Sequence, residues 1–337
     1  MPVQFVFKSQ NPKPTEVFDC YWHFAAERQA IFFNRLENRP FPWTIDPILR
    51  EFRFTNVYRA SDRVSQYLIR NVIYRGNHSP ENVFFRILLF KLFNKVETWE
   101  LLESCFEELV YSSSFFYRTD RLLSAAILSG RRIYSAAYIM PSGGDHYDRK
   151  HSAHLMLLKN MMRDDLPLKV ADCKTMRQCF DLLKSYPMIG DFLAYQYAID
   201  INYSTLTNFS EMDLVVPGPG ARSGLRKCFA DFGCRSEEAT IQWVAERQAE
   251  EFVRLGLSFK TLWGRPLQLI DCQNLFCEVD KYSRVRFPEL NGKHGRRRIK
   301  QKFKPDTRPL DLWFPPKWGL NAGRQNASEV PLKTTCA

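Results

Sequence analysis

A carboxylate that follows a helical hairpin is the feature of this chain with the clearest chemistry. Asp213 lies one predicted helix and one loop beyond a short turn at residues 187–190. Such a hairpin can hold a nucleic acid, because its tight turn exposes backbone N–H groups and the second helix directs its positive N-terminal end towards a phosphate. A carboxylate just beyond the hairpin can act on a glycosidic bond.

The hairpin is predicted over about residues 175–201, with Thr175 as the cap of its first helix. Met188, Ile189 and Gly190 form the turn and are the residues expected to contact a phosphate. A glycine is needed here where the chain must adopt a positive φ or let a phosphate approach closely. An ordinary turn between two helices uses the same residue types, so this segment alone leaves both interpretations open.

Asp213 is flanked by apolar residues, Met212 before it and Leu214 after it. These neighbours predict a partly buried carboxylate. Burying an acid costs free energy, so its presence in such a place indicates a structural partner or a function. The next segment, 217–227, predicts a rigid turn into a helix with basic residues near its start. We expect a second set of DNA contacts from Gly218, Gly220, Arg222, Arg226 and Lys227.

Helical periodicity dominates the remaining elements, so the predicted fold class is mostly α with few short strands. Apolar residues recur at helical spacing over 48–74, 80–93, 97–111, 121–128, 151–162, 223–232 and 236–255. The alternation typical of strands is confined to 132–139 and 213–216.

Three parts are predicted along the chain: an N-terminal arm at 1–45, a helical domain at 46–285 and a basic C-terminal tail at 286–337. The net charge is +11, and ten Lys/Arg stand against one acid between residues 281 and 304. This balance favours a polyanionic partner, nucleic acid before a membrane surface. A basic run of this kind grips phosphates without reading sequence. A basic but otherwise ordinary soluble protein stays open as the plainer interpretation.

Metal and cofactor chemistry is not expected. The nine cysteines have no zinc or iron–sulfur spacing and indicate a reduced, cytoplasmic setting. The most apolar run, 83–93, is too short to span a bilayer, so no membrane partner is expected.

The phosphate-binding pattern G-x-x-x-x-G-K-[ST] is absent from the sequence, which argues against a nucleotide kinase site in this chain. His146, His151 and His154 are expected at the surface.

Three segments, 53–67, 186–196 and 213–227, resemble the helical domain found beside 5-hydroxymethyldeoxyuridine DNA kinases. This group is also called α-glutamyl/putrescinyl thymine pyrophosphorylases. The order hairpin, helix, loop, aspartate is similar to the helix-hairpin-helix superfamily of DNA glycosylases, and the likeness covers about residues 45–285. The resemblance implies a glycosylase-like helical fold, Asp213 as the catalytic residue and double-stranded DNA with modified bases, such as phage DNA, as the partner.

Two residues depart from the glycosylase pattern. Met188 stands where the commoner hairpin has its first glycine, and Phe192 stands where bifunctional glycosylases carry a lysine that forms a Schiff base. Because phenylalanine has no amine, the resemblance implies a monofunctional N-glycosylase that leaves an abasic site. Some members of the wider group look like defence glycosylases that remove modified, including glucosylated, bases from phage DNA.

A glycosylase flips its target nucleotide out of the base stack into a pocket. Residues that could line this pocket, several of them on one face of the predicted helix 48–74, are Asn56, Arg59, Asp62, Arg63, Gln196, Gln273 and Glu278. A buried structural network of ion pairs is an equally open interpretation of Arg59, Asp62, Arg63 and their neighbour Gln66.

Two other functions remain open at this point. A transferase of the same fold would attach an amino acid or polyamine to an activated hydroxymethyl pyrimidine in DNA. A DNA-binding adaptor without catalysis is the other alternative. No obligate protein partner is inferred in any of these cases.

Overall fold

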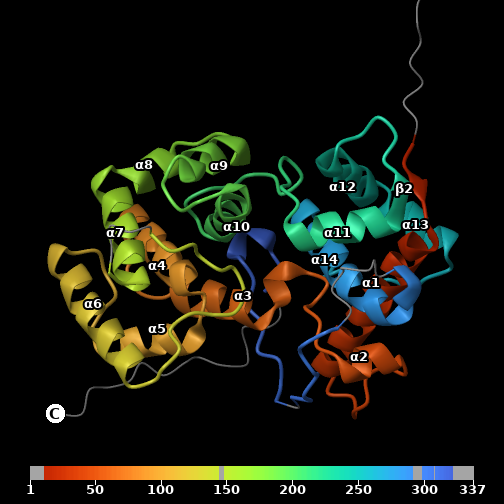
Figure 1. Ribbon diagram of the computed structural model, residues 1–337, viewed down its shortest axis with the longest axis horizontal. Coiled ribbons are helices and arrows are strands. Elements are labelled where there is room, and N and C mark those ends of the chain that lie inside the picture. The colour runs from red at the N-terminus through yellow and green to blue at the C-terminus, as the bar shows by residue number, and fades with distance from the viewer. Residues whose placement is uncertain (1–10, 144–147, 291–297, 307, 322–337) are drawn as a thin grey trace, which may run out of the picture.

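The computed structural model describes residues 11–143, 148–290, 298–306 and 308–321, and it shows two lobes of helices (Figure 1). The predicted mostly-α class is confirmed. The helices of the first lobe are α3 (Arg63–Tyr67), α4 (Pro80–Phe93), α5 (Val96–Glu103), α6 (Ser113–Leu128), α7 (Lys150–Arg163), α8 (Leu166–Ala171), α9 (Met176–Lys184) and α10 (Asp191–Asn202). Those of the second lobe are α1 (Glu16–Leu36), α2 (Pro47–Glu51), α11 (Pro219–Cys228), α12 (Glu237–Glu246), α13 (Gln248–Arg254) and α14 (Leu269–Arg286).

Short elements complete the description. Strands β1 (Lys13–Pro14) and β2 (Phe229–Asp231) pair antiparallel. Single turns of 3-10 helix occur at Arg59–Ser61, Pro288–Leu290 and Pro316–Trp318, and Leu68–Ile73 is π-helical. No helix in the part of the chain that the structure describes is long and apolar enough to cross a membrane.

Helix α4 is the buried element of the first lobe. The Ser79 hydroxyl accepts a hydrogen bond from the Asn82 N–H, Pro80 begins the helix, and Asn94 ends it in the left-handed conformation with φ +48°. Residues 83–93 are all buried, so the helix packs on every side rather than along one stripe. It packs against the π-helical segment Leu68–Ile73 and against α7, α8 and α10.

Helix α14 has the corresponding place in the second lobe, where α1, α11 and α12 pack against it. A capping box formed by Gln268 and Asp271 begins this helix. Helix α11 comes closest: a Cβ atom on Gly224 would lie 2.0 Å from the carbonyl oxygen of Phe276. The missing side chain of Gly224 is therefore what lets the two helices pack at this distance.

The segment 48–74 is not the continuous helix that its periodicity predicts. It consists of α2, an extended stretch, a 3-10 turn, α3 and the π-helical turn. The extended stretch begins at Phe52, which forms an isolated bridge to Lys302 from the C-terminal segment, and this long-range pairing overrides the local helical preference. Arg59, Asp62 and Arg63 consequently do not share one helical face.

The strands expected at 132–139 and 213–216 are also wrong. Both segments are irregular connections between helices and pair with no strand among the described residues. Alternating apolar residues form a strand only where a partner backbone is available to satisfy the N–H and C=O groups.

Both ends of the chain contribute to the core, and the division into an arm at 1–45, a helical domain and a tail at 286–337 stays a prediction. Helix α1 buries Tyr21 and Trp22 completely. In the C-terminal segment Ile299, Leu312 and Phe314 are buried against the lobes. The peak of basic residues at 291–297 lies outside the described residues.

We expect Gly224→Ala to destabilise the protein by about 3 kcal/mol, because the new methyl group forces α11 away from α14. Thermal and urea unfolding would measure the change. Gly190→Ala is the matched control, since a Cβ there meets nothing within 4 Å and the φ of −84° suits any residue. Equal stability of the two variants would contradict the packing argument.

Candidate functional site

Helices α9 and α10 form the hairpin that the sequence predicts, joined by residues 185–190. The Thr175 hydroxyl accepts a hydrogen bond from the Gln178 N–H at 3.2 Å and begins α9. The left-handed backbone expected of a glycine occurs at Met188, with φ +66°, whereas Gly190 has a φ of −84°. Gly190 is exposed and leaves the start of α10 without a side-chain cap. The first N–H groups of α10 are therefore accessible to an anion.

Asp213 is exposed, so the prediction of a partly buried carboxylate is wrong. Its neighbours Leu214 and Val215 turn into the core, and the Asp213 N–H donates to the Ser210 carbonyl in a turn that leaves the carboxylate outside. The side chain makes no ion pair or hydrogen bond with any residue that the structure describes.

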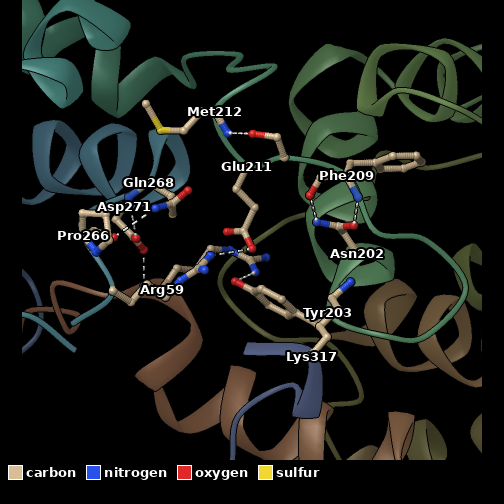
Figure 2. Close-up of polar contacts among 12 residues, drawn as sticks. Arg59, Asn202, Tyr203, Phe209, Glu211, Met212, Pro266, Gln268, Asp271 and Lys317 are labelled. Atoms are coloured by element: carbon tan, nitrogen blue, oxygen red, sulfur yellow. Dashed lines mark hydrogen bonds and ion pairs between the residues drawn. The ribbon is translucent and has the colours of Figure 1, made fainter. Parts of the chain in front are cut away.

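The buried carboxylate in this loop is Glu211, which is 6% exposed. It pairs with Arg265 at 2.9 Å, and burial raises the pKa of Glu211 (Figure 2). Glu211 is thus committed to a structural ion pair, while Asp213, two residues later, is available for a ligand.

The loop that carries Asp213 is fixed to the start of α10 by a close packing contact. A Cβ atom on Gly218 would lie 2.7 Å from the Phe192 ring, so the backbone of the loop rests on that ring. Phe192 in turn stacks on Tyr138, with ring centroids 5.8 Å apart and ring planes 8° apart. Hairpin, aspartate loop and Tyr138 therefore meet in one place.

Beneath Tyr138 lies a buried charge network centred on Arg59 and Asp200. Arg59 Nη1 is 2.8 Å from Asp200 Oδ1, and Lys91 Nζ is 3.1 Å from Asp200 Oδ2. The Lys91 ammonium lies 4.4 Å from the centre of the Tyr138 ring. Burial opposes the charge on Asp200, but the two cations hold its pKa below the ordinary value. Burial lowers the pKa of Lys91 to about 8 despite the attraction of Asp200.

Arg59 also joins the two lobes through hydrogen bonds. Its Nε donates to Gln196 Oε1 at 3.2 Å, and its Nη1 donates to the Tyr203 hydroxyl at 3.1 Å, both on or next to α10. Its backbone N–H donates to Asp271 of α14 at 2.8 Å, as Figure 2 shows. Gln196 continues the network to Gln273 of α14.

The residues predicted to line a base pocket fall into two groups in the structure. Arg59, Gln196 and Gln273 belong to the buried network below Tyr138. Arg63 lies apart from them: it is the first residue of α3, after the 3-10 turn, and its side chain is exposed.

The second group is Asn56, Asp62 and Glu278, which lie around Arg28. Arg28 Nη2 donates to Asn56 at 2.6 Å, and the Asn56 N–H donates to Asp62 at 2.7 Å. Burial raises the pKa of Asp62 to about 7. Arg28 and Asn56 line a separate pocket whose walls are the aromatic residues Phe41, Trp43, Phe52, Phe54 and Phe303.

The basic residues that follow Asp213 are largely paired with acids. Arg222 and Arg226 share Glu237, at 3.2 and 3.3 Å, on the surface of α11. Lys227 is tied to Asp280 at 3.0 Å. The glycines of this turn serve packing as well, since a Cβ on Gly220 would lie 2.5 Å from the Cys277 sulfur. Their expected contacts with DNA stay a prediction.

Two of the histidines expected at the surface, His151 and His154, are buried, while His146 lies outside the described residues. His151 Nε2 is 2.9 Å from the Ser124 hydroxyl and 3.4 Å from Asp120. One nitrogen faces both partners, so the ring cannot pass a proton from one to the other as a catalytic triad requires. The described residues hold no cluster of three or more metal-binding side chains.

Sequence reasoning missed four members of the central site: Lys91, Tyr138, Asp200 and Tyr203. Lys91 and Asp200 had a detectable signal, since each is a charge inside an otherwise apolar helix and buried charges are nearly always paired. Tyr138 lies in an irregular segment and had none.

Comparison with known proteins connects this architecture to one family. A family model described as "5-hmdU DNA kinase, helical domain" matches residues 15–292, which include the hairpin, the Asp213 loop and α14. Over 286 residues the chain is 27% identical to a protein of Bacillus phage SP10 named "5-hmdU DNA kinase".

The match covers 79% of this chain and 45% of the phage protein, so the chain spans less than half the length of this relative. No solved structure matches. On the strength of the family match, the chain belongs to the 5-hmdU DNA kinase helical-domain family.

Proposed function

We propose that this protein acts on a modified base in double-stranded DNA as a monofunctional N-glycosylase, with Asp213 as its catalytic residue. The observation that carries the proposal is the free carboxylate of Asp213 in a loop packed onto the start of α10. The other acids near the hairpin are engaged: Asp191 pairs with Lys184, Asp200 with Arg59, and Glu211 with Arg265.

The reaction follows from this placement. DNA bound at the hairpin presents a flipped nucleotide, and the bond between C1′ of the sugar and the base breaks. The Asp213 carboxylate stabilises the positive charge that develops on the sugar and accepts a proton from the attacking water. Water oxygen ends on C1′, the base leaves with a proton, and the strand keeps an abasic site.

Phe192 supports the absence of strand cleavage. It occupies the first turn of α10 and packs against Gly218 and Tyr138. A lyase step needs an amine at the reacting sugar, and Phe192 offers only an aromatic surface. The Phe192–Tyr138 pair is suited to stack against a planar base.

The modified base that we propose as the target follows from the names of the related family and protein. Their printed name refers to 5-hmdU in DNA, so a 5-hydroxymethyl pyrimidine, or a larger group built on it, is the first substrate to test. Defence against phages with modified genomes is part of the same proposal. The transferase alternative differs in its product, because it would enlarge the nucleoside rather than release a free base.

Asp213→Asn should lower base release by about 100-fold or more, because the amide can neither take a proton from water nor balance the charge on the sugar. The measurement is mass spectrometry of free bases after incubation with DNA that carries unmodified, hydroxymethylated or glucosylated pyrimidines. Alkaline cleavage of the strand reports the abasic sites independently.

Asp172→Asn is the matched control, since Asp172 is also exposed but lies away from the hairpin turn, at the end of α8. It should retain full activity. Binding of DNA should be unchanged in both variants. An active Asp213→Asn protein would overturn the catalytic assignment, and an enlarged nucleoside in place of a free base would favour the transferase.

Met188→Gly should bind DNA roughly 3-fold more tightly, because glycine accepts the left-handed backbone and removes a side chain from the approach of the phosphate. Fluorescence anisotropy with labelled duplex DNA measures the affinity. Met188→Ala is the control, because it shortens the side chain but retains the Cβ atom in the strained conformation. Weaker binding by the glycine variant would contradict a phosphate contact at this turn.

A further inference from the structure

A second basic surface lies outside the hairpin, in an open groove of about 710 Å³ in the first lobe. The groove runs between α3, α5 and the segment that follows α6. Four cationic residues line it: Arg63, Lys95, Arg131 and Arg132. Glu97 is the one acid in the lining.

Three of these cations form no ion pair with a described residue, although the charge of Arg63 contributes to lowering the pKa of Glu97. Glu97 is engaged by Lys95, whose Nζ donates to it at 2.8 Å, and this hydrogen bond lowers the pKa of Glu97. Arg63, Arg131 and Arg132 are exposed and form no ion pair within four ångströms with any residue that the structure describes. Unpaired arginines around one concave surface indicate an anionic ligand, and their planar guanidinium groups suit phosphate.

The backbone that carries the two adjacent arginines is fixed in place. The Arg131 N–H donates to the Ala126 carbonyl at 2.9 Å, and the Ser135 N–H donates to the Phe93 carbonyl at 3.0 Å. Between them, the Thr98 hydroxyl donates to the Ile133 carbonyl at 2.8 Å. Anchoring on both sides reduces the entropy lost when a ligand binds.

The groove is linked to the candidate active site through a chain of buried contacts. Asn94, in the groove lining, accepts a hydrogen bond from Lys91 Nζ at 2.8 Å. Lys91 pairs with Asp200 and lies against Tyr138. The segment 131–136 leads directly to Tyr138, which stacks on Phe192 at the start of α10. Tyr138 thus connects the segment that lines the groove with the start of the hairpin helix α10.

We propose that the groove lined by Arg63, Arg131 and Arg132 binds the sugar–phosphate backbone of DNA that flanks the target nucleotide, on the side away from the hairpin. The proposal deepens the proposed function, on which it rests. DNA would be held from both sides of Tyr138, and neither contact would read base sequence.

The test compares two double variants that remove the same charge from the same lobe. The double variant Arg131→Ala with Arg132→Ala removes two cationic side chains from the lining of the groove. Arg118→Ala with Arg121→Ala removes two exposed arginines of α6 that do not line it. Affinity for an unmodified duplex of about 21 base pairs, roughly two helical turns, is measured by anisotropy over a range of salt concentrations.

We expect the groove variant to bind roughly 10-fold more weakly at low salt and the slope of log affinity against log salt to fall by about two. The α6 variant should match the parent protein. Arg131→Lys with Arg132→Lys should restore most of the affinity, since the charge is kept.

The outcomes separate the two proposals. If the parent binds DNA and releases base while the groove variant binds equally well, the groove assignment is wrong and the proposed function stands. If both double variants weaken binding equally, the effect is one of net charge and the groove assignment is again wrong. If the parent protein does not bind DNA at all, the proposed function itself fails.

Discussion

The buried ion pair between Arg59 and Asp200 is the interaction on which the arrangement of the site depends. Both side chains are almost fully removed from solvent, and moving such charges out of water costs several kcal/mol per ion. The cost is offset only when geometry and hydrogen bonding are complete. Arg59 has hydrogen-bond partners on α10 and α14, whereas Asp200 is compensated by charge, through its ion pairs with Arg59 and the second cation Lys91. The pair thus forces α4, α10, α14 and the 3-10 turn at Arg59 into one relative position.

That constraint explains how an exposed catalytic candidate can be held accurately. Asp213 itself makes no ion pair among the described residues, and its loop has no regular secondary structure. Its position comes from Gly218 against Phe192, from buried Leu214 and Val215, and from Glu211 paired with Arg265. These contacts attach the loop to α10, which the Arg59 network holds in turn. A carboxylate that is free to meet a substrate needs such support from its neighbours, because any direct partner would compete with the substrate.

Sequence reasoning succeeded where local signals agree with the tertiary structure. The helix predicted to begin at Pro80 is α4, and Thr175 caps α9 as predicted, because the signals that start a helix lie within one turn of it. It missed α14, the central helix of the second lobe. That helix is buried on most sides and directs Asp271, Gln273, Glu278 and Asp280 inwards, so it lacks the apolar stripe by which a surface helix is recognised. The exposure of Asp213 could not be predicted either, since apolar neighbours reveal that a segment is anchored but not which side chain points outwards.

Under the proposed function, the distribution of cations has a consequence for how DNA would be held. Met188 puts a side chain where a glycine would let a phosphate approach. Arg222 and Arg226 share the single acid Glu237, and Lys227 pairs with Asp280, so their positive charge is only partly free. The hairpin and the turn after Asp213 therefore offer less free positive charge than their sequences indicate. The groove at Arg63, Arg131 and Arg132 offers cations that form no ion pair with a described residue, and its segment 131–136 leads to the same Tyr138 that joins hairpin and aspartate loop. The affinity of a protein for DNA rises with the number of phosphate charges that it neutralises. Cations without ion pairs, close to a hairpin that offers few phosphate contacts, would therefore add most to the free energy of DNA binding. In the proposed complex, the groove would supply the phosphate contacts that the hairpin lacks, and Tyr138 would connect the two.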